Sequence, residues 1–114
     1  MKRLLAAACV AVAVVVPTSA AAAPGTITVG VVEDAANEQY GFDPSPVTIN
    51  VGDTIVFTNT GTENHDFLSL DGEAFGSDPV PPGGTFSHTF AQPGKVLLAC
   101  DLHARMETTI TVRG

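Results

Sequence analysis

Hydrophobic and polar residues alternate along most of the chain from residue 27 onward. Apolar residues occupy every second position in segments 27–31 and 47–51, and Ile55 and Phe57 share one face of the next segment while Val56 and Thr58 share the other. In segment 86–90, Phe86, His88 and Phe90 share one face, and in the wholly apolar segment 96–100, Val96, Leu98 and Cys100 are in phase. Apolar residues at 110 and 112 repeat the spacing near the end. A period of two is typical of a strand with one face in the core and the other in solvent. The pattern therefore predicts a series of short, half-buried strands.

Clusters of proline, glycine and aspartate separate these predicted strands. They occur at residues 43–46, 52–53, 71–72, 81–84 and 93–94. Proline presets φ and glycine tolerates positive φ, so both residues favour turns. Short strands separated by such turns predict an antiparallel β-sandwich. The polar segment 33–40 fits either a loop or one helical turn, and the pattern does not choose between them.

The first 23 residues have the composition of a secretory signal peptide. Lys2 and Arg3 precede an apolar run over residues 4–16, and small residues follow it. The segment just reaches the length of a membrane span, but a Pro-Thr-Ser sequence interrupts it. We therefore expect residues 1–23 to be removed as a signal peptide and residues 24–114 to form one domain. The domain would be exported to the periplasm or beyond, with no stable membrane insertion after cleavage.

Removal of this signal would change both the charge and the cysteine content. Lys2 and Arg3 are two of the five basic residues, so three remain against twelve acidic ones, a net charge of −9. Nucleic acid and anionic membranes are poor partners for such a domain. Cys9 would also be lost, leaving Cys100 as the single cysteine in a compartment where thiols normally form disulfides. An unpaired thiol there calls for a specific role.

Three candidate metal ligands lie close together in residues 99–108, ACDLHARMET. Cys100 continues the inward phase of the preceding strand, and His103 and Met106 follow at intervals of three. A lone buried cysteine is often only a small apolar core residue. A tight loop, however, can gather thiolate, imidazole and thioether around one point. A cysteine, two histidines and a weak axial methionine make an electron-transfer copper site, whereas zinc rarely uses a thioether.

Such a copper site needs a second imidazole, and the sequence offers two candidates. His65 lies just past the predicted strand around residues 55–57, in a loop at one end of the sandwich. His88 lies in the middle of a predicted strand, in phase with Phe86 and Phe90. A position at a strand end favours His65 as the ligand, with His88 as the alternative.

Sequence motifs in both halves of the chain resemble those of cupredoxins. In GFDPSPVTINVGDTIVFTNTGTENHDF the Phe-x-Pro, Ile-x-Val, Gly-Asp-Thr and Phe-x-Asn elements precede a histidine. PGGTFSHTFAQPGKVLLACDLHARM is similar to the second half of the family pattern, and its Cys-x-x-His-x-x-Met loop is similar to that of amicyanins. The resemblance implies an all-β, antiparallel Greek-key β-sandwich with one type 1 copper per chain. It also implies His65, Cys100 and His103 as strong ligands and Met106 as the axial one.

The chain departs from the family pattern in three places, without losing a ligand. Asp66 follows the first histidine where the family usually has asparagine, whose amide ties the ligand loops together. Residues 97–99 are aliphatic where aromatic residues are common, and Thr108 stands where the family has glycine. These changes are expected to alter the surroundings of the ligands and hence the reduction potential.

The resemblance implies an exported one-electron carrier that is not an enzyme. We expect redox partner proteins to dock near His103, between the apolar residues Leu102 and Ala104, and the domain to be a monomer. Related copper enzymes need histidines for additional coppers, and the three histidines of this chain leave none to spare. Two alternatives remain open: a copper-binding or copper-delivery protein of the same fold, and a metal-free β-sandwich interaction module with Cys100 in its core.

Overall fold

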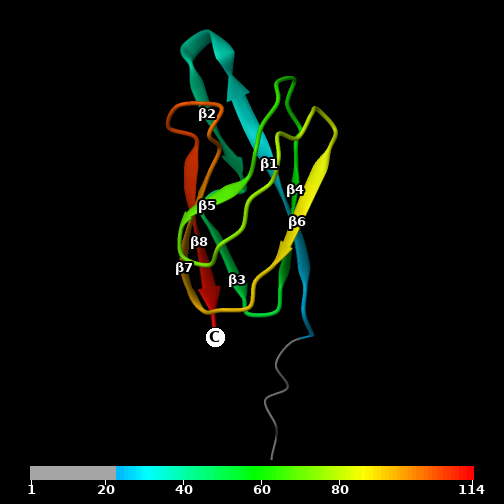
Figure 1. Ribbon diagram of the computed structural model, residues 1–114, viewed down its shortest axis with the longest axis vertical. Coiled ribbons are helices and arrows are strands. Elements are labelled where there is room, and N and C mark those ends of the chain that lie inside the picture. The colour runs from blue at the N-terminus through cyan, green and yellow to red at the C-terminus, as the bar shows by residue number, and fades with distance from the viewer. Residues whose placement is uncertain (1–22) are drawn as a thin grey trace, which may run out of the picture.

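The computed structural model describes residues 23–114 and shows a sandwich of two four-stranded sheets (Figure 1). The predicted signal peptide lies, except for its last residue, outside the described residues. The elements are β1 (Thr26–Asp34), η1 (Ala35–Asn37), β2 (Gln39–Asp43), β3 (Val47–Asn50), β4 (Thr54–Thr58), β5 (Leu68–Asp71), β6 (Thr85–Thr89), β7 (Gly94–Ala99) and β8 (Glu107–Arg113). Within the described residues, no helix is long and apolar enough to cross a membrane.

The strand order is β2-β1-β4-β6 in one sheet and β3-β8-β7-β5 in the other. The all-β sandwich predicted from the alternation is confirmed. Each sheet also contains one parallel pair, β1 with β4 and β3 with β8, among antiparallel neighbours. The sheets are therefore mixed, because the chain crosses between them before it returns to pair with an earlier strand.

The core between the sheets is built from the inward positions of the alternating segments. The ring of Phe57 has no exposed surface and stacks on the ring of Phe67 at 5.2 Å between centroids. Burial of a side chain of this size stabilises the fold by about 1.5–3 kcal/mol. Val51 was expected to continue the inward face of its strand, but it is 39% exposed. The reason is that β3 ends at Asn50 and the chain turns there.

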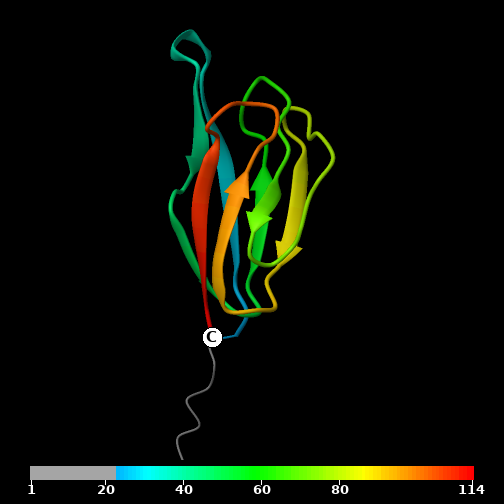
Figure 2. The ribbon, with the colours of Figure 1, turned by 60° about the vertical axis from the view of Figure 1, so that its left-hand side comes forward.

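The segment from β1 to β2 extends beyond one end of the sandwich as a hairpin (Figures 1 and 2). Its tip is the single helical turn η1, where the Asp34 side chain accepts a hydrogen bond from the Asn37 backbone at 3.3 Å. Of the polar segment 33–40, only residues 35–37 form a helical turn, because Glu33 and Asp34 belong to β1 and Gln39 and Tyr40 to β2, which neither sequence alternative included. The loop between β7 and β8 lies at the same end, so the hairpin stands beside the candidate ligands.

Candidate metal centre

The loop from Cys100 to Met106 is a short connection between two paired strands. Its ends are joined by the Cys100 N–H, which donates to the Met106 carbonyl at 3.0 Å. Arg105 adopts φ 62°, a left-handed conformation that lets the chain reverse before β8. Both ends of the loop point into the protein, since Cys100 is 4% exposed and Met106 is 1% exposed. The burial of Cys100 predicted from its strand phase is confirmed.

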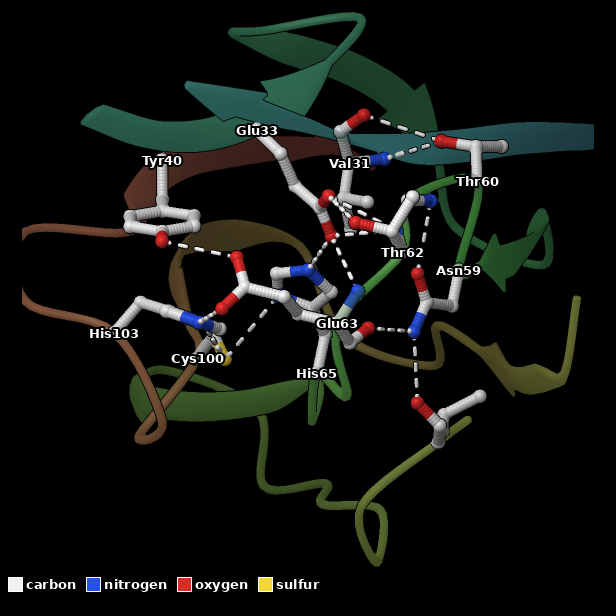
Figure 3. A network of polar contacts seen from close by, with 12 residues as sticks. Val31, Glu33, Tyr40, Asn59, Thr60, Thr62, Glu63, His65, Cys100 and His103 are labelled. Carbon is white, nitrogen blue, oxygen red and sulfur yellow. Dashed lines mark hydrogen bonds and ion pairs between the residues drawn. The ribbon is translucent and has the colours of Figure 1, made fainter. Parts of the chain in front are cut away.

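His65 is held in the segment between β4 and β5. Its backbone forms an isolated bridge with Val80, with N–H to carbonyl distances of 3.2 Å and 2.6 Å in the two directions. The buried Asn59 amide donates to the carbonyls of Glu63 and Val80 and so fixes the loop between them (Figure 3). His65 is thereby fully buried, with no exposed surface.

The structure brings three of the four predicted ligands into one cluster. One donor atom each from His65, Cys100 and His103 lie within 4.8 Å of one another. The Cys100 Sγ is 3.8 Å from Nδ1 of His65 and 3.9 Å from Nδ1 of His103. Met106, the fourth, is buried at the end of the same loop. Two imidazoles, a thiol and a buried thioether form a donor set that suits one copper ion.

His88 lies in a different environment. It is on β6, where its ring stacks on Phe75 and meets Phe90 edge-on, each at 4.7 Å between centroids. Its Nε2 contacts the Glu73 carboxylate at 2.5 Å. Among the described residues, His88 is therefore not part of the cluster around Cys100.

Backbone groups and Asp66 surround the Cys100 sulfur. Burial raises the pKa of the Cys100 thiol, while the backbone N–H groups of Asp66 and Leu102 act in the opposite direction. The Asp66 N–H lies 3.4 Å from the sulfur, and the Asp66 carboxylate accepts a hydrogen bond from the Asp101 N–H at 2.7 Å. Asp66 thus connects the two ligand loops as an acceptor, which a carboxylate can do without a proton.

A carboxylate from the hairpin lies against the far side of His65. Glu33 Oε1 is 2.6 Å from His65 Nε2. Burial by itself would raise the pKa of Glu33, but hydrogen bonds from Thr62, His65 and the Glu63 backbone outweigh it and lower the pKa to about 2. The Glu33 side chain is 12% exposed. Its carboxylate is held in place by the hydrogen bonds from Thr62, Glu63 and His65.

The ring of His103 is covered by Tyr40 of β2. The two rings stack at 3.9 Å between centroids and 24° between planes. The Tyr40 hydroxyl donates to Glu63 Oε2 at 2.9 Å, and this hydrogen bond is the main reason that the pKa of Tyr40 is raised. The other Glu63 oxygen is 3.6 Å from His103 Nε2. The His103 side chain keeps 12% of its surface exposed, so its contact with solvent is narrower than the open ring edge expected from the sequence.

A groove of about 740 Å³ runs beside this stacked pair. It is lined by residues 37–40 of the hairpin and residues 102–105 of the ligand loop. Leu102, expected to form an apolar rim here, is 46% exposed.

Sequence reasoning missed Glu33, Tyr40 and Glu63. Glu33 precedes His65 by 32 positions, and Tyr40 precedes Glu63 by 23. Neither spacing is a recognisable motif, and all three residues lie in or near polar segments. The only local signal is the lone tyrosine of the chain, placed in a segment that is otherwise polar.

Comparisons with known proteins agree on one family. A family model described as a cupredoxin-like domain matches residues 4–112. Among solved structures, a novel purple cupredoxin from Nitrosopumilus maritimus is 24% identical, with a TM-score of 0.66 over 75% of this chain and 98% of that chain. A reduced Cu(I) form of an amicyanin variant is 21% identical, with a TM-score of 0.66 over 80% of this chain and 85% of that chain.

A third similar structure belongs to a larger protein. It is the copper-containing nitrite reductase from Thermus scotoductus SA-01, 26% identical with a TM-score of 0.65. The match covers 81% of this chain but only 23% of the reductase. The resemblance therefore extends to one part of that protein.

Proposed function

The chain belongs to the cupredoxin-like domain family, and from this premise we propose that it is an exported type 1 copper protein that carries single electrons between redox partners. The observation that supports this most directly is the convergence of His65, Cys100 and His103 at one end of the sandwich. Export rests on the signal-like composition of residues 1–23.

In this proposal His65, Cys100 and His103 would hold one copper ion strongly, and Met106 would be a weak fourth ligand. The ion supplies a one-electron couple between Cu(II) and Cu(I). The protein contributes a fixed arrangement of donors. Cys100 is fixed by the hydrogen bond that closes its loop, and His65 by its bridge to Val80. Ligands fixed in this way change little when the charge on the metal changes, which favours rapid electron exchange.

We propose that partners dock around His103, the ligand whose side chain reaches solvent. Leu102 provides exposed apolar surface beside it. An apolar patch suits brief docking because it desolvates readily. The acidic character of the chain, −7 in all, would attract a partner with a basic surface.

An enzyme is not part of the proposal. Two of the three histidines are used at the cluster, and His88 is paired with Glu73 and packed between aromatic rings. A second copper with histidine ligands would therefore need residues that this chain does not have.

Addition of Cu(II) to the metal-free domain tests the proposal. We expect an intense visible thiolate-to-copper band that the Cys100→Ala variant lacks, because this transition requires a bound thiolate. His65→Ala should disrupt the band, whereas the matched control His88→Ala should leave it intact. Absence of the band in the wild-type protein would favour the metal-free interaction module.

A blue protein that does not exchange electrons would instead favour a role in copper binding or delivery. Mixing the reduced and oxidised forms measures this directly, since rapid exchange broadens the NMR signals of the ligand side chains. Slow exchange in the wild-type protein would contradict the electron carrier while leaving the copper site in place.

A further inference from the structure

The Glu33 carboxylate, near the end of β1, is in hydrogen-bond contact with four groups of the loop that precedes β5. It accepts from the Thr62 backbone N–H at 2.9 and 3.0 Å, from the Thr62 hydroxyl at 3.0 Å and from the Glu63 N–H at 3.0 Å. The fourth group is Nε2 of His65, at 2.6 Å. These donors come from one loop, and they converge on a single side chain that comes from β1 (Figure 3).

The loop is shaped to receive this carboxylate. A Cβ atom at Gly61 would lie 1.9 Å from Glu33 Oε1, so only glycine leaves room for the side chain. The same loop is attached to β1 a second time, where the Thr60 hydroxyl donates to the Val31 carbonyl and accepts from the Val31 N–H, both at 3.1 Å. The alignment of Glu33 with the loop is therefore set by two separate sets of contacts.

The two imidazoles of the cluster differ in what lies behind them. His65 Nε2 is in hydrogen-bond contact with a carboxylate that is 12% exposed. His103 Nε2 is 3.6 Å from a Glu63 carboxylate whose side chain is 42% exposed. The second distance is longer than a hydrogen bond. Only His65 has a close acceptor for its ring proton.

We propose that Glu33 is a positioning residue of the metal centre, which fixes the ring and the tautomer of His65 and favours the higher oxidation state of the bound ion. An ionised carboxylate can only accept a hydrogen bond, so the proton of the neutral imidazole must lie on Nε2. The Nδ1 lone pair is then free and faces Cys100 Sγ, 3.8 Å away. This inference rests on the proposed function, because it assigns Glu33 a role toward copper.

The negative charge of Glu33 next to His65 should change the affinities for Cu(II) and Cu(I) by different amounts. A carboxylate that accepts the ring proton makes the imidazole a stronger donor, and loss of such a partner typically weakens metal binding by about 10- to 100-fold. Cu(II) carries more charge than Cu(I) and gains more from a strong donor. Removal of the carboxylate should therefore weaken Cu(II) binding more than Cu(I) binding.

Glu33→Gln measures this difference through the reduction potential. We expect the ratio of Cu(II) to Cu(I) affinity to fall about tenfold, which raises the potential by about 59 mV for a one-electron couple. Both oxidation states bind the same metal-free protein. A purely structural defect in that protein lowers both affinities alike and leaves the potential unchanged, so the potential separates a role at the metal from a role in folding.

Glu73→Gln is the matched control, because Glu73 holds His88 Nε2 and two backbone N–H groups in the same way, away from Cys100. Its potential should equal that of the wild-type protein. Gly61→Ala is the second variant, since the added methyl group displaces the carboxylate without removing it. Gly61→Ala should also raise the reduction potential, and it provides the test if Glu33→Gln does not fold.

Nitrogen NMR of the metal-free wild-type protein gives a readout that does not depend on copper. We expect His65 to be the Nε2–H tautomer in the wild type and a mixture of tautomers in Glu33→Gln. An Nδ1–H tautomer in the wild type, or an unchanged potential in both Glu33→Gln and Gly61→Ala, overturns the inference. If the wild-type protein shows the Nε2–H tautomer but binds no copper, the proposed function fails instead and the role toward the metal fails with it.

Discussion

Because folding lowers the pKa of Glu33, the free energy of unfolding of the metal-free domain should depend on pH in the acidic range. The folded-state pKa is about 2, against an ordinary value of 4.5. A group whose pKa is lowered by folding stabilises the fold at pH values above its unfolded pKa, and this contribution is lost as the pH falls toward the folded value. The loss should therefore occur between about pH 5 and pH 2.

The size of the effect follows from the same two values. At about 1.4 kcal/mol for each pKa unit, the fall from 4.5 to about 2 corresponds to at most about 3.4 kcal/mol. The hydrogen bonds from Thr62 to Glu33 lie at the surface, where solvent screening weakens them and reduces this contribution to roughly 2 kcal/mol. In a domain of this size, that amount lowers the melting temperature by about 8 to 16 °C.

Urea unfolding of the wild type and of Glu33→Gln at several pH values from 7 to 3 measures this contribution. We expect Glu33→Gln to be less stable by roughly 2 kcal/mol at pH 7, and the gap to narrow as the pH falls. Glu107→Gln serves as the control, because Glu107 is an exposed carboxylate at the start of β8. A gap between wild type and Glu33→Gln that stays constant over the whole pH range would show that the charge of Glu33 is not what the loop stabilises.

Three further predictions concern single groups. The pKa of the Tyr40 phenol should lie above its ordinary value of 10, and Glu63→Gln should lower it by removing the acceptor carboxylate. Ultraviolet titration measures this pKa directly, because the chain contains one tyrosine and no tryptophan. In the metal-free domain, burial should keep Cys100 a thiol at neutral pH, so iodoacetamide should alkylate it slowly, and faster in Asp66→Asn, which lacks the nearby carboxylate. Intact mass of the exported protein should show that residues 1–23 or a slightly shorter segment have been removed, and recovery of only the full-length chain in the membrane fraction would contradict this.

The features that the sequence predicted well are those that depend on local alternation. The phase of residues 96 and 98 placed Cys100 in the core, and its side chain is 4% exposed. His65, which follows a strand, lies in the cluster with Cys100 and His103, whereas His88, which lies within a strand, is outside that cluster among the described residues. In both cases the direction of a side chain follows from its place in or beside one strand, which the sequence records directly.

The features that sequence reasoning did not predict depend on contacts between distant segments. Alternation cannot show that β1 runs parallel to β4, because the pairing depends on how the chain crosses between sheets. The contact of Glu33 with His65 depends on β1 continuing past the sandwich into the hairpin, opposite Tyr40 in register. The prediction that Val51 lies in the core was wrong for a local reason. The apolar alternation continues one residue beyond Asn50, where β3 ends.

The contacts around the cluster divide it into a fixed part and a part that is less constrained. His65 is bound by its backbone bridge to Val80 and by Glu33, and Cys100 by the hydrogen bond that closes its loop. His103 lies within that loop, where the stacked ring of Tyr40 is its closest aromatic neighbour and Glu63 is beyond hydrogen-bond distance. Any rearrangement that accompanies a change of oxidation state should therefore occur first at His103. Since His103 is also the proposed histidine ligand that reaches solvent, a partner bound in the groove between residues 37–40 and 102–105 would contact the part of the site that is less constrained.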